Sequence, residues 1–272
     1  MSRLRFTILG CGSSGGVPRI GNHWGECDPA NPKNRRQRCS MLVERITEQG
    51  RTQVLIDTTP DMRAQLLDAK VGALDAVVYT HSHADHVHGI DDLRQIVFNM
   101  RKRLPVWADS DTQEALLNRF AYAFVQPADS NYQPICDLHA IRHEHAFEVT
   151  GAGGAIPFQP FRVEHGNIDA LGFRIGPLAY LPDVSAIPDP AWAHLEGLEC
   201  WVLDALRRTP HPTHAHLAQS LEWIARAQPT SAVLTNMHID LDHDAVAHET
   251  PDHIQPAFDG MVLEFVAPDS SK

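Results

Sequence analysis

The sequence lacks the features that mark membrane or secreted proteins. No apolar run in the 272 residues approaches the length of a membrane span, and the apolar stretch before Gly10 is too short for the core of a signal peptide. The five cysteines are an odd number and are widely scattered without a C-x-x-C pair, which argues against a disulfide framework. We therefore expect a cytoplasmic protein that makes no membrane contact.

Basic residues are also scarce, with 23 Lys and Arg against 34 Asp and Glu and a formal net charge of −11. This balance argues against an extended surface for nucleic acid or anionic membranes, and it leaves room for a local basic site. Internal repeats, low-complexity tracts and Pro/Ser linkers are absent, so residues 1–272 are expected to form one domain. A homodimer is compatible with these properties.

Short apolar runs alternate with helical patterns along the chain, which predicts an α/β (α+β) fold. The helical patterns cover residues 61–69, 111–124 and 213–227, and the stretch 151–155 is typical of a turn between strands. Polar residues stand where apolar runs end, namely Asp57, His81, Asp183, Asp204 and His238. Strand ends are where a rigid scaffold holds its chemistry, so these residues are candidates for a functional site.

Histidine is unusually frequent, with 17 residues, and four metal-donor side chains occur in Thr80-His81-Ser82-His83-Ala84-Asp85-His86. The segment follows a predicted strand, so His81, His83, Asp85 and His86 converge as the chain turns. Imidazole and carboxylate groups without a thiolate suit zinc, iron or manganese. One or two such histidines are common in polar loops, but four donors at this spacing predict a metal site.

This T-H-x-H-x-D-H motif resembles the signature of the metallo-β-lactamase superfamily, whose fold is a four-layer αβ/βα sandwich. His165 in Val163–Gly166, Asp183 after Leu181-Pro182, and His238 in Leu234–His238 are similar to that family's later ligands. The resemblance implies that His81, His83 and His165 hold one metal and that Asp85, His86 and His238 hold a second, with Asp183 shared by both. Asp57 and Asp204 are candidates to orient ligating histidines, although capping roles fit them equally well.

Two divalent ions, either Mn²⁺ or Zn²⁺, would keep a net positive charge after Asp85 and Asp183 neutralise part of it. Such a centre lowers the pKa of a bridging water and attracts an anionic substrate, and a phosphodiester fits this electrostatics. The resemblance therefore implies a metal-dependent hydrolase in which a metal-bridging hydroxide attacks the substrate. Asp85 is assigned a catalytic role as well as a ligand role.

The opening Gly10-Cys11-Gly12-Ser13-Ser14-Gly15-Gly16-Val17-Pro18 is not a dinucleotide loop, because it departs from G-x-G-x-x-G. A tight turn with close backbone approach is the preferred interpretation, and phosphate contact through backbone amides is the alternative. With Arg35–Ser40, His214-Ala215-His216-Leu217 and Phe258–Met261, this opening resembles PhnP-like cyclic phosphodiesterases most, then PqqB and ribonuclease Z. The resemblance implies a cyclic ribose or nucleotide phosphate as substrate and His214, at the start of a predicted helix, as general acid.

Several alternatives remain open from the sequence. tRNA 3′ processing, a PqqB-like role, thioester hydrolysis and a metal-binding protein without turnover all use the same fold. Arg35, Arg36 and Arg38 are either phosphate ligands or a solvated face. PhnP-like proteins carry a cysteine cluster for a structural zinc after the glycine loop, whereas this segment has only Cys27, with His23 nearby. A second zinc site formed by Cys27, His23 and His243 is therefore a weak alternative.

Overall fold

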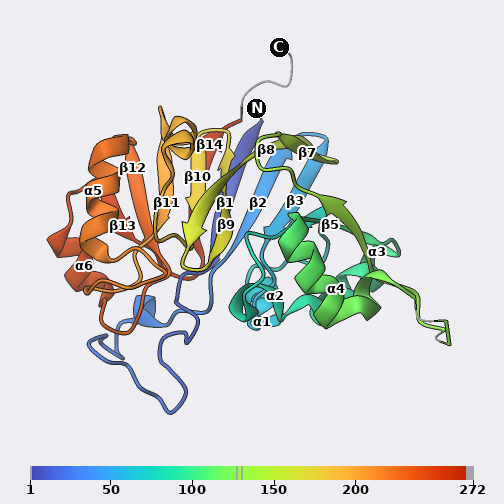
Figure 1. Ribbon diagram of the computed structural model, residues 1–272, viewed down its shortest axis with the longest axis horizontal. Coiled ribbons are helices and arrows are strands. Elements are labelled where there is room, and N and C mark those ends of the chain that lie inside the picture. The colour runs from blue at the N-terminus through green and yellow to red at the C-terminus, as the bar shows by residue number, and fades with distance from the viewer. Residues whose placement is uncertain (1, 127, 130, 268–272) are drawn as a thin grey trace. The chain divides into compact units, whose positions relative to one another are not determined.

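The computed structural model describes residues 2–126, 128–129 and 131–267 (Figure 1). Two mixed seven-stranded sheets with flanking helices make up the fold, which confirms the α/β class. Backbone contacts divide the chain into two compact units. Unit 1 comprises the residues up to Leu9, Ser40–Pro157 and those from Val262 onward, and unit 2 comprises Gly10–Cys39 and Phe158–Met261. The single domain expected from the sequence stays a prediction.

The first sheet has the strand order β14-β1-β2-β3-β4-β5-β6. Its strands are Met261–Val266 (β14), Arg3–Gly10 (β1), Ser40–Thr47 (β2), Gly50–Ile56 (β3), Ala76–Val78 (β4), Leu104–Ala108 (β5) and Cys136–Ala140 (β6). β2 and β3 form an antiparallel hairpin, and β3, β4, β5 and β6 run parallel. Parallel strands end at one edge, so the segments after β3, β4, β5 and β6 start from the same side of the sheet.

Four helices follow strands of the first sheet: Met62–Asp68 (α1), Ala84–Val87 (α2), Leu93–Met100 (α3) and Ser110–Phe124 (α4). The core of unit 1 is built from strand and helix residues together, including Leu55, Val77, Leu66, Ile96 and Leu116. α4 begins where Asp109 accepts a hydrogen bond from the Thr112 backbone N–H, and α3 ends at Arg101 in the left-handed conformation. A short 3₁₀ helix, Ile90–Asp92, precedes α3.

The second sheet has the order β13-β12-β11-β10-β9-β8-β7. Its strands are Ile254–Pro256 (β13), Ser231–Thr235 (β12), Cys200–Asp204 (β11), Leu178–Leu181 (β10), Ile168–Ile175 (β9), Gly154–His165 (β8) and Phe147–Gly151 (β7). β10 to β13 are parallel, and β8, β9 and β10 are antiparallel neighbours. Leu217–Ala227 (α5), His243–Glu249 (α6) and two 3₁₀ helices, Pro32–Asn34 and Asp189–Leu195, complete the elements.

Two sequence-based expectations about local structure can be compared with these bounds. The predicted turn at residues 151–155 is confirmed, since it joins β7 to β8 with Gly154 at φ +94°. The predicted helix over 213–227 is too long, because α5 begins only at Leu217. Ala215 instead donates its N–H to Val184 O and accepts from the N–H of Leu206, so His214 lies in an irregular loop before the helix.

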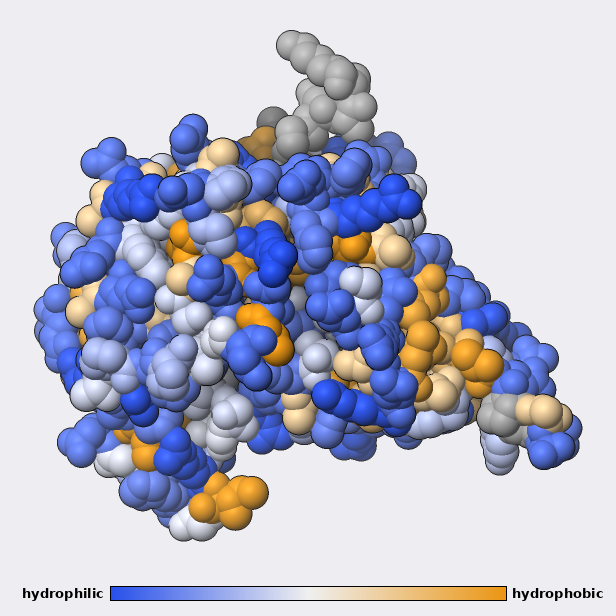
Figure 2. Space-filling view, viewed as in Figure 1, coloured by the Kyte–Doolittle hydropathy of each residue, from blue (hydrophilic) through white to orange (hydrophobic). Residues whose placement is uncertain are grey.

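Most of the face seen in Figure 2 is hydrophilic, and hydrophobic residues gather over the part of the chain that Figure 1 draws as α4. Leu117 and Tyr122 of α4 are among the exposed hydrophobic residues. None of the helices in the described ranges combines the length and the hydropathy that a bilayer span requires.

Candidate metal centre

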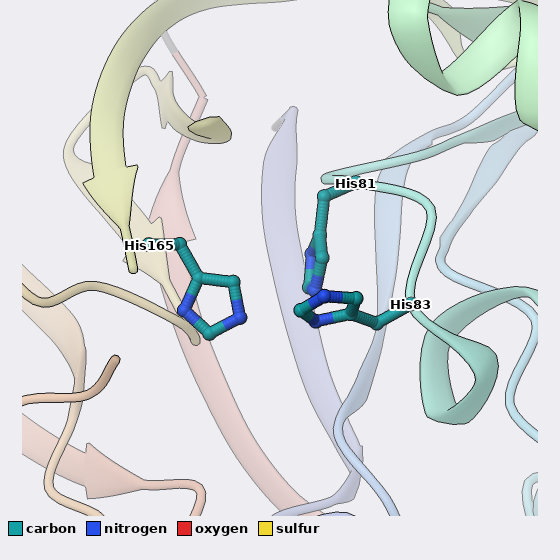
Figure 3. Close-up of side chains that lie close together, drawn as sticks. All are labelled: His81, His83 and His165. Carbon is teal, nitrogen blue, oxygen red and sulfur yellow. The ribbon is translucent and has the colours of Figure 1, made fainter. Parts of the chain in front are cut away.

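In unit 1 the predicted donors lie on the loop between β4 and α2 and in α2 itself. Thr80 and His81 are buried directly after the strand, and His83 immediately precedes α2, which carries Asp85 and His86 (Figure 3 draws His81 and His83). Asp57 follows β3 in the left-handed conformation, at φ +63°, which aspartate tolerates better than most residues. Its Oδ1 accepts from the Thr80 N–H and its Oδ2 from the Thr80 hydroxyl, both at 2.8 Å. Asp57 therefore holds the start of this loop against the end of the neighbouring strand.

Asp57 also fixes the ring nitrogens of two histidines. His86 Nδ1 lies 2.8 Å from Asp57 Oδ2, so Nδ1 carries the hydrogen and Nε2 carries the lone pair, 3.7 Å from Asp85 Oδ2. The Thr80 hydroxyl gives its one hydrogen to Asp57, so at 3.0 Å it accepts from His81 Nδ1. His81 then also presents the Nε2 lone pair. One buried carboxylate thus sets both imidazoles in the tautomer that binds metal through Nε2.

Burial and His86 shift the pKa of Asp57 in opposite directions. Burial raises the pKa of this fully buried carboxyl group, and the charge and hydrogen bond of His86 counteract part of that rise. The His81 ring centroid lies 4.7 Å from that of His83 and 4.3 Å from that of His86. Unit 1 therefore gathers three imidazoles within one loop, and Asp85 lies beside His86.

In unit 2, His165 occupies the last position of β8 (Figure 3). Its Nδ1 lies 2.7 Å from Thr213 O, which can only accept, so Nδ1 carries the hydrogen and Nε2 the lone pair. Nε2 lies 3.9 Å from Asp183 Oδ1. Gly166 follows at φ +68°, and a Cβ there would lie 2.3 Å from Thr213 Cγ2. Only glycine permits this close approach, which keeps Thr213 against the His165 ring.

His214 lies between two carboxylates of unit 2. Its Nδ1 is 3.0 Å from Asp204 Oδ2 and 3.4 Å from Asp183 Oδ1, and its ring centroid is 4.6 Å from that of His165. Single donor atoms of His165, Asp183 and His214 all lie within 4.8 Å of one another, which is the spacing of groups that share a metal ion. The residue predicted as general acid therefore stands beside two predicted ligands.

Asp204 is completely buried, which raises its pKa to about 6 despite the opposing influence of His214. Its Oδ2 also accepts from the Val184 N–H, and its Oδ1 lies 3.1 Å from Asn236 Nδ2. Asn236 Nδ2 lies 3.4 Å from Asp183 Oδ1 as well, so the amide hydrogens face two carboxylates. Asp204 thus contacts His214, which is predicted as general acid and not as a metal ligand, so its orientation of a ligating histidine stays a prediction. Asn236 ties Asp204 to Asp183.

The positions of His238 and Asp85 give less support to their predicted roles as metal ligands. His238 Nδ1 lies 3.1 Å from Asp240 Oδ1, and its Nε2 contacts the Arg19 guanidinium. Burial, followed by the charge of Arg19, lowers the pKa of His238, which favours the neutral imidazole. Within the described residues, the groups of three or more donors at metal-binding distance include neither His238 nor Asp85. Their ligand roles stay predictions.

The possible second zinc site has little support. Cys27 Sγ lies 3.5 Å from Ile239 O and 3.9 Å from the buried Arg36 guanidinium, whose positive charge disfavours a cation there. His243 Nδ1 lies 2.9 Å from Asp244 Oδ1. Across the part of the chain that the structure describes, Cys27 and His243 join no metal-donor group, and neither does His23.

The glycine loop and the arginine run have structural contacts. A Cβ on Gly12 would lie 2.8 Å from Arg36 Cβ, so the glycine allows the loop to pack closely against Arg36. The expected close approach of this loop to the metal centre stays a prediction. Arg36 donates to His238 O and Leu241 O, so it crosslinks loops, while Arg35 lies over the Trp24 ring. Arg36 is therefore part of the interior and not of a solvated face.

Sequence reasoning missed Asn236, Arg19 and the supporting role of Thr80. Asn236 follows β12 directly, so the strand-end pattern that singled out Asp57 and Asp204 also applied to it. Arg19 carried no comparable signal, because its contact with His238 depends on how the loop after Pro18 folds. Imidazole and carboxylate donors with assigned Nε2 lone pairs fit divalent zinc or manganese, and a softer thiolate site is not indicated.

Comparisons with known proteins bear on the family and the fold. A sequence profile described as "Beta-lactamase superfamily domain" matches residues 52–239. The crystal structure of a diphosphatase from the PhnP family is 38% identical with a TM-score of 0.87, covering 97% of this chain and 98% of that one. Zn²⁺-bound PqqB from Methylobacterium extorquens has a TM-score of 0.71 at 17% identity, with coverage of 95% and 99%, and supports the fold alone.

A curated octanoyltransferase of Porphyromonas gingivalis is 33% identical over 264 residues, which are 95% of this chain and 51% of that protein. The chain thus spans about half the length of this curated relative. The agreement with the solved structures confirms the sandwich fold that the sequence predicts.

Proposed function

The chain belongs to the metallo-β-lactamase superfamily, and on that premise we propose that it is a metal-dependent phosphoric diester hydrolase acting on a small cyclic ribose or nucleotide phosphate. The observation that carries this proposal is the placement of His214, which lies beside His165 and Asp183 with Nδ1 directed at Asp204. Hydrolysis of an ester with a poor leaving group needs such a proton donor next to the metal ligands.

In this proposal His81, His83 and His165 hold one ion, Asp85, His86 and His238 hold the other, and Asp183 serves both. The Nε2 lone pairs assigned to His81, His86 and His165 support it, because each ring has its Nδ1 engaged by the protein. When bound, two divalent ions supply Lewis-acid polarisation of the phosphoryl group and a water acidic enough to attack at neutral pH. The metal is Zn²⁺ or Mn²⁺, which these donors do not distinguish.

His214 acts in this scheme by protonating the departing oxygen from Nε2. Its Nδ1–H donates to Asp204, so the buried carboxylate stabilises the imidazolium before transfer and keeps Nδ1 protonated afterwards. The His214 side chain is 17% exposed and Asp204 is not exposed at all, so the ring can reach a substrate while its partner stays dry. Asp204 is a positioning residue for this proton donor.

A second candidate is the hydrolysis of a diphosphate, which the similarity to a PhnP-family diphosphatase favours. Both reactions break a P–O bond and leave an anionic oxygen, so the same residues would serve either substrate. The candidates differ in the group beyond the reacting phosphorus. The net charge of −11 continues to argue against tRNA processing.

The test combines metal analysis with a substrate panel. Purified protein is expected to contain two equivalents of Zn or Mn, and to hydrolyse ribose 1,2-cyclic phosphate or 2′,3′-cyclic nucleotides faster than ADP-ribose, precursor tRNA or S-lactoylglutathione. Preference for ADP-ribose would select diphosphate hydrolysis. Turnover of the thioester alone, or inactivity on every phosphate ester with both metal sites filled, would refute the proposal.

A further inference from the structure

A cavity lies in unit 1, at the opposite edge of the parallel strands from the metal loop. It has a volume of about 380 Å³ and is lined by residues of α3, by the segment 101–103 and by the segment 131–135. The lining segments lead directly into the N-terminal ends of β5 and β6, which pair from Leu104 with Cys136. Thr80 and His81 instead follow the C-terminal end of the parallel strand β4. At about 3.3 Å per residue, the five-residue strands separate the two edges by roughly 16 Å.

Four cations line this cavity: Arg94, Arg101, Lys102 and Arg103. No acidic residue is among its lining residues in the described chain, although the protein as a whole carries a net charge of −11. The positive charge around this cavity attracts an anion, although the protein as a whole is negatively charged.

Only two of the four cations at the cavity form ion pairs with carboxylates of the described residues. Arg94 pairs with Asp91 at 3.1 Å, and Arg103 pairs with Asp137 at 2.9 Å. Arg101 and Lys102 are exposed and have no ion-pair partner within the described ranges. Two uncompensated cations therefore face the cavity, and a guanidinium next to an ammonium suits the oxygens of a phosphate group.

Aromatic rings accompany these charges. Phe98 is 61% exposed and Tyr132 is 80% exposed, and both line the cavity. Large exposed rings beside cations are the combination by which proteins bind nucleotides, because the ring stacks on a base while the cation contacts phosphate. An anion without a planar apolar part would leave the rings uncovered.

We propose that this cavity is a binding site for a nucleoside polyphosphate, with the phosphates at Arg101 and Lys102 and the base against Phe98 or Tyr132. The volume lies in the range of small-molecule sites and is large enough for one nucleotide. The site lies apart from the metal loop, so its occupant is bound and not hydrolysed there. This inference does not depend on the hydrolysis proposed above.

The test is isothermal titration of the full-length protein with α,β-methylene-ADP, which cannot be hydrolysed at the bridging position, and with adenosine and inorganic pyrophosphate. The titrations are done with metal-loaded protein and repeated after removal of metal with a chelator. We expect saturable nucleotide binding that survives metal removal, and at least tenfold weaker binding of adenosine and of pyrophosphate.

The variant is Arg101→Asn/Lys102→Gln, in which asparagine suits the left-handed conformation at Arg101 (φ +56°). Its matched control is Arg63→Gln/Lys70→Asn, which removes the same charge in unit 1 from exposed residues outside the cavity and also places asparagine at a left-handed position (φ +57°). The first variant should weaken nucleotide binding at least tenfold, and the control should bind like the wild type.

Four outcomes would overturn the proposal. Nucleotide binding that disappears with the metal, or that the two variants reduce equally, would place the nucleotide elsewhere or make the effect one of overall charge. Equal affinity for pyrophosphate and the nucleotide would show an anion site without base recognition. Binding of single-stranded RNA without binding of the mononucleotide would equally refute it.

Discussion

Replacing Asp204 by asparagine tests the proton-donor assignment most directly. The carboxylate accepts from His214 Nδ1 and from the Val184 N–H through the same oxygen, Oδ2. An amide nitrogen in that place can accept from neither. If the amide is turned the other way, its nitrogen takes the place of Oδ1 and can no longer accept from Asn236 Nδ2. The imidazolium of His214 therefore loses the nearer of its two anionic neighbours, and the pKa of His214 should fall.

The magnitude follows from the interaction that is lost. A hydrogen bond to a charged group contributes about 1.5–3 kcal/mol, and each 1.36 kcal/mol is a factor of ten in rate, so kcat/KM should fall about 10- to 150-fold. At pH 8 Asp204 is ionised in the wild type, because its pKa of about 6 lies well below the pH of the assay. The loss should appear with substrates that need a proton at the leaving oxygen.

The assay compares bis(p-nitrophenyl) phosphate, whose leaving group departs readily, with a cyclic nucleotide, whose leaving group does not. We expect Asp204→Asn to slow the second far more than the first. Asp244→Asn is the matched control, since it breaks an Asp–His pair of similar geometry, 2.9 Å from His243, on α6. It should leave both rates unchanged.

Equal losses on the two substrates would mean that Asp204 supports the site as a whole and not the proton transfer, which would refute the reasoning. Thermal unfolding of each variant checks that the fold survives removal of this buried group. If Asp204→Asn does not fold, His214→Gln provides the same comparison, because His214 is partly exposed and its removal leaves Asp204 bonded to Val184 and Asn236.

Three further predictions concern metal affinity, backbone conformation and pH. Asp57→Asn should weaken metal binding about 10- to 100-fold in a chelator competition, because Asp57 orients two ligating rings; unchanged affinity would contradict this. Gly166→Ala should lower the unfolding free energy more than Gly197→Ala, since both have positive φ but only the first places a Cβ against Thr213; equal losses in urea titrations would contradict the clash. Burial raises the pKa of Asp259 to about 7. The protonated form therefore contributes free energy of unfolding that is fully present below about pH 4 and is lost as the pH rises through 7. Asp259→Asn should flatten this part of the plot of unfolding free energy against pH.

The donor motif was predictable because its evidence is local. Consecutive residues from Thr80 to His86 turn out of a strand, so spacing alone brings their side chains together, as the ring distances confirm. The strand-end pattern also identified Asp57 and Asp204, because parallel strands deliver their final residues to one edge. These inferences needed only the periodicity of the chain.

Other features depended on contacts distant in sequence. β8 contains Pro157 and Pro160, which obscure a strand in the sequence, yet Pro160 lies opposite Phe173 of β9 in the sheet. His214 was expected at a helix start, but its neighbour Ala215 pairs with Val184 from another segment. The burial of Arg36 was equally invisible in the sequence, because its guanidinium donates to backbone carbonyls of residues 238 and 241.

Asp57 orients both His81 and His86, which limits the substitutions that the metal loop can accept. Because His81 is reached through Thr80 and His86 directly, the two rings respond together to any alteration of this one carboxylate. A substitution that adjusted the basicity of one ligand would disturb the other. A substitution at Asp57 should therefore not leave one ring correctly oriented and the other not. Variation in metal preference should arise instead at other predicted ligands, such as His83 or His238.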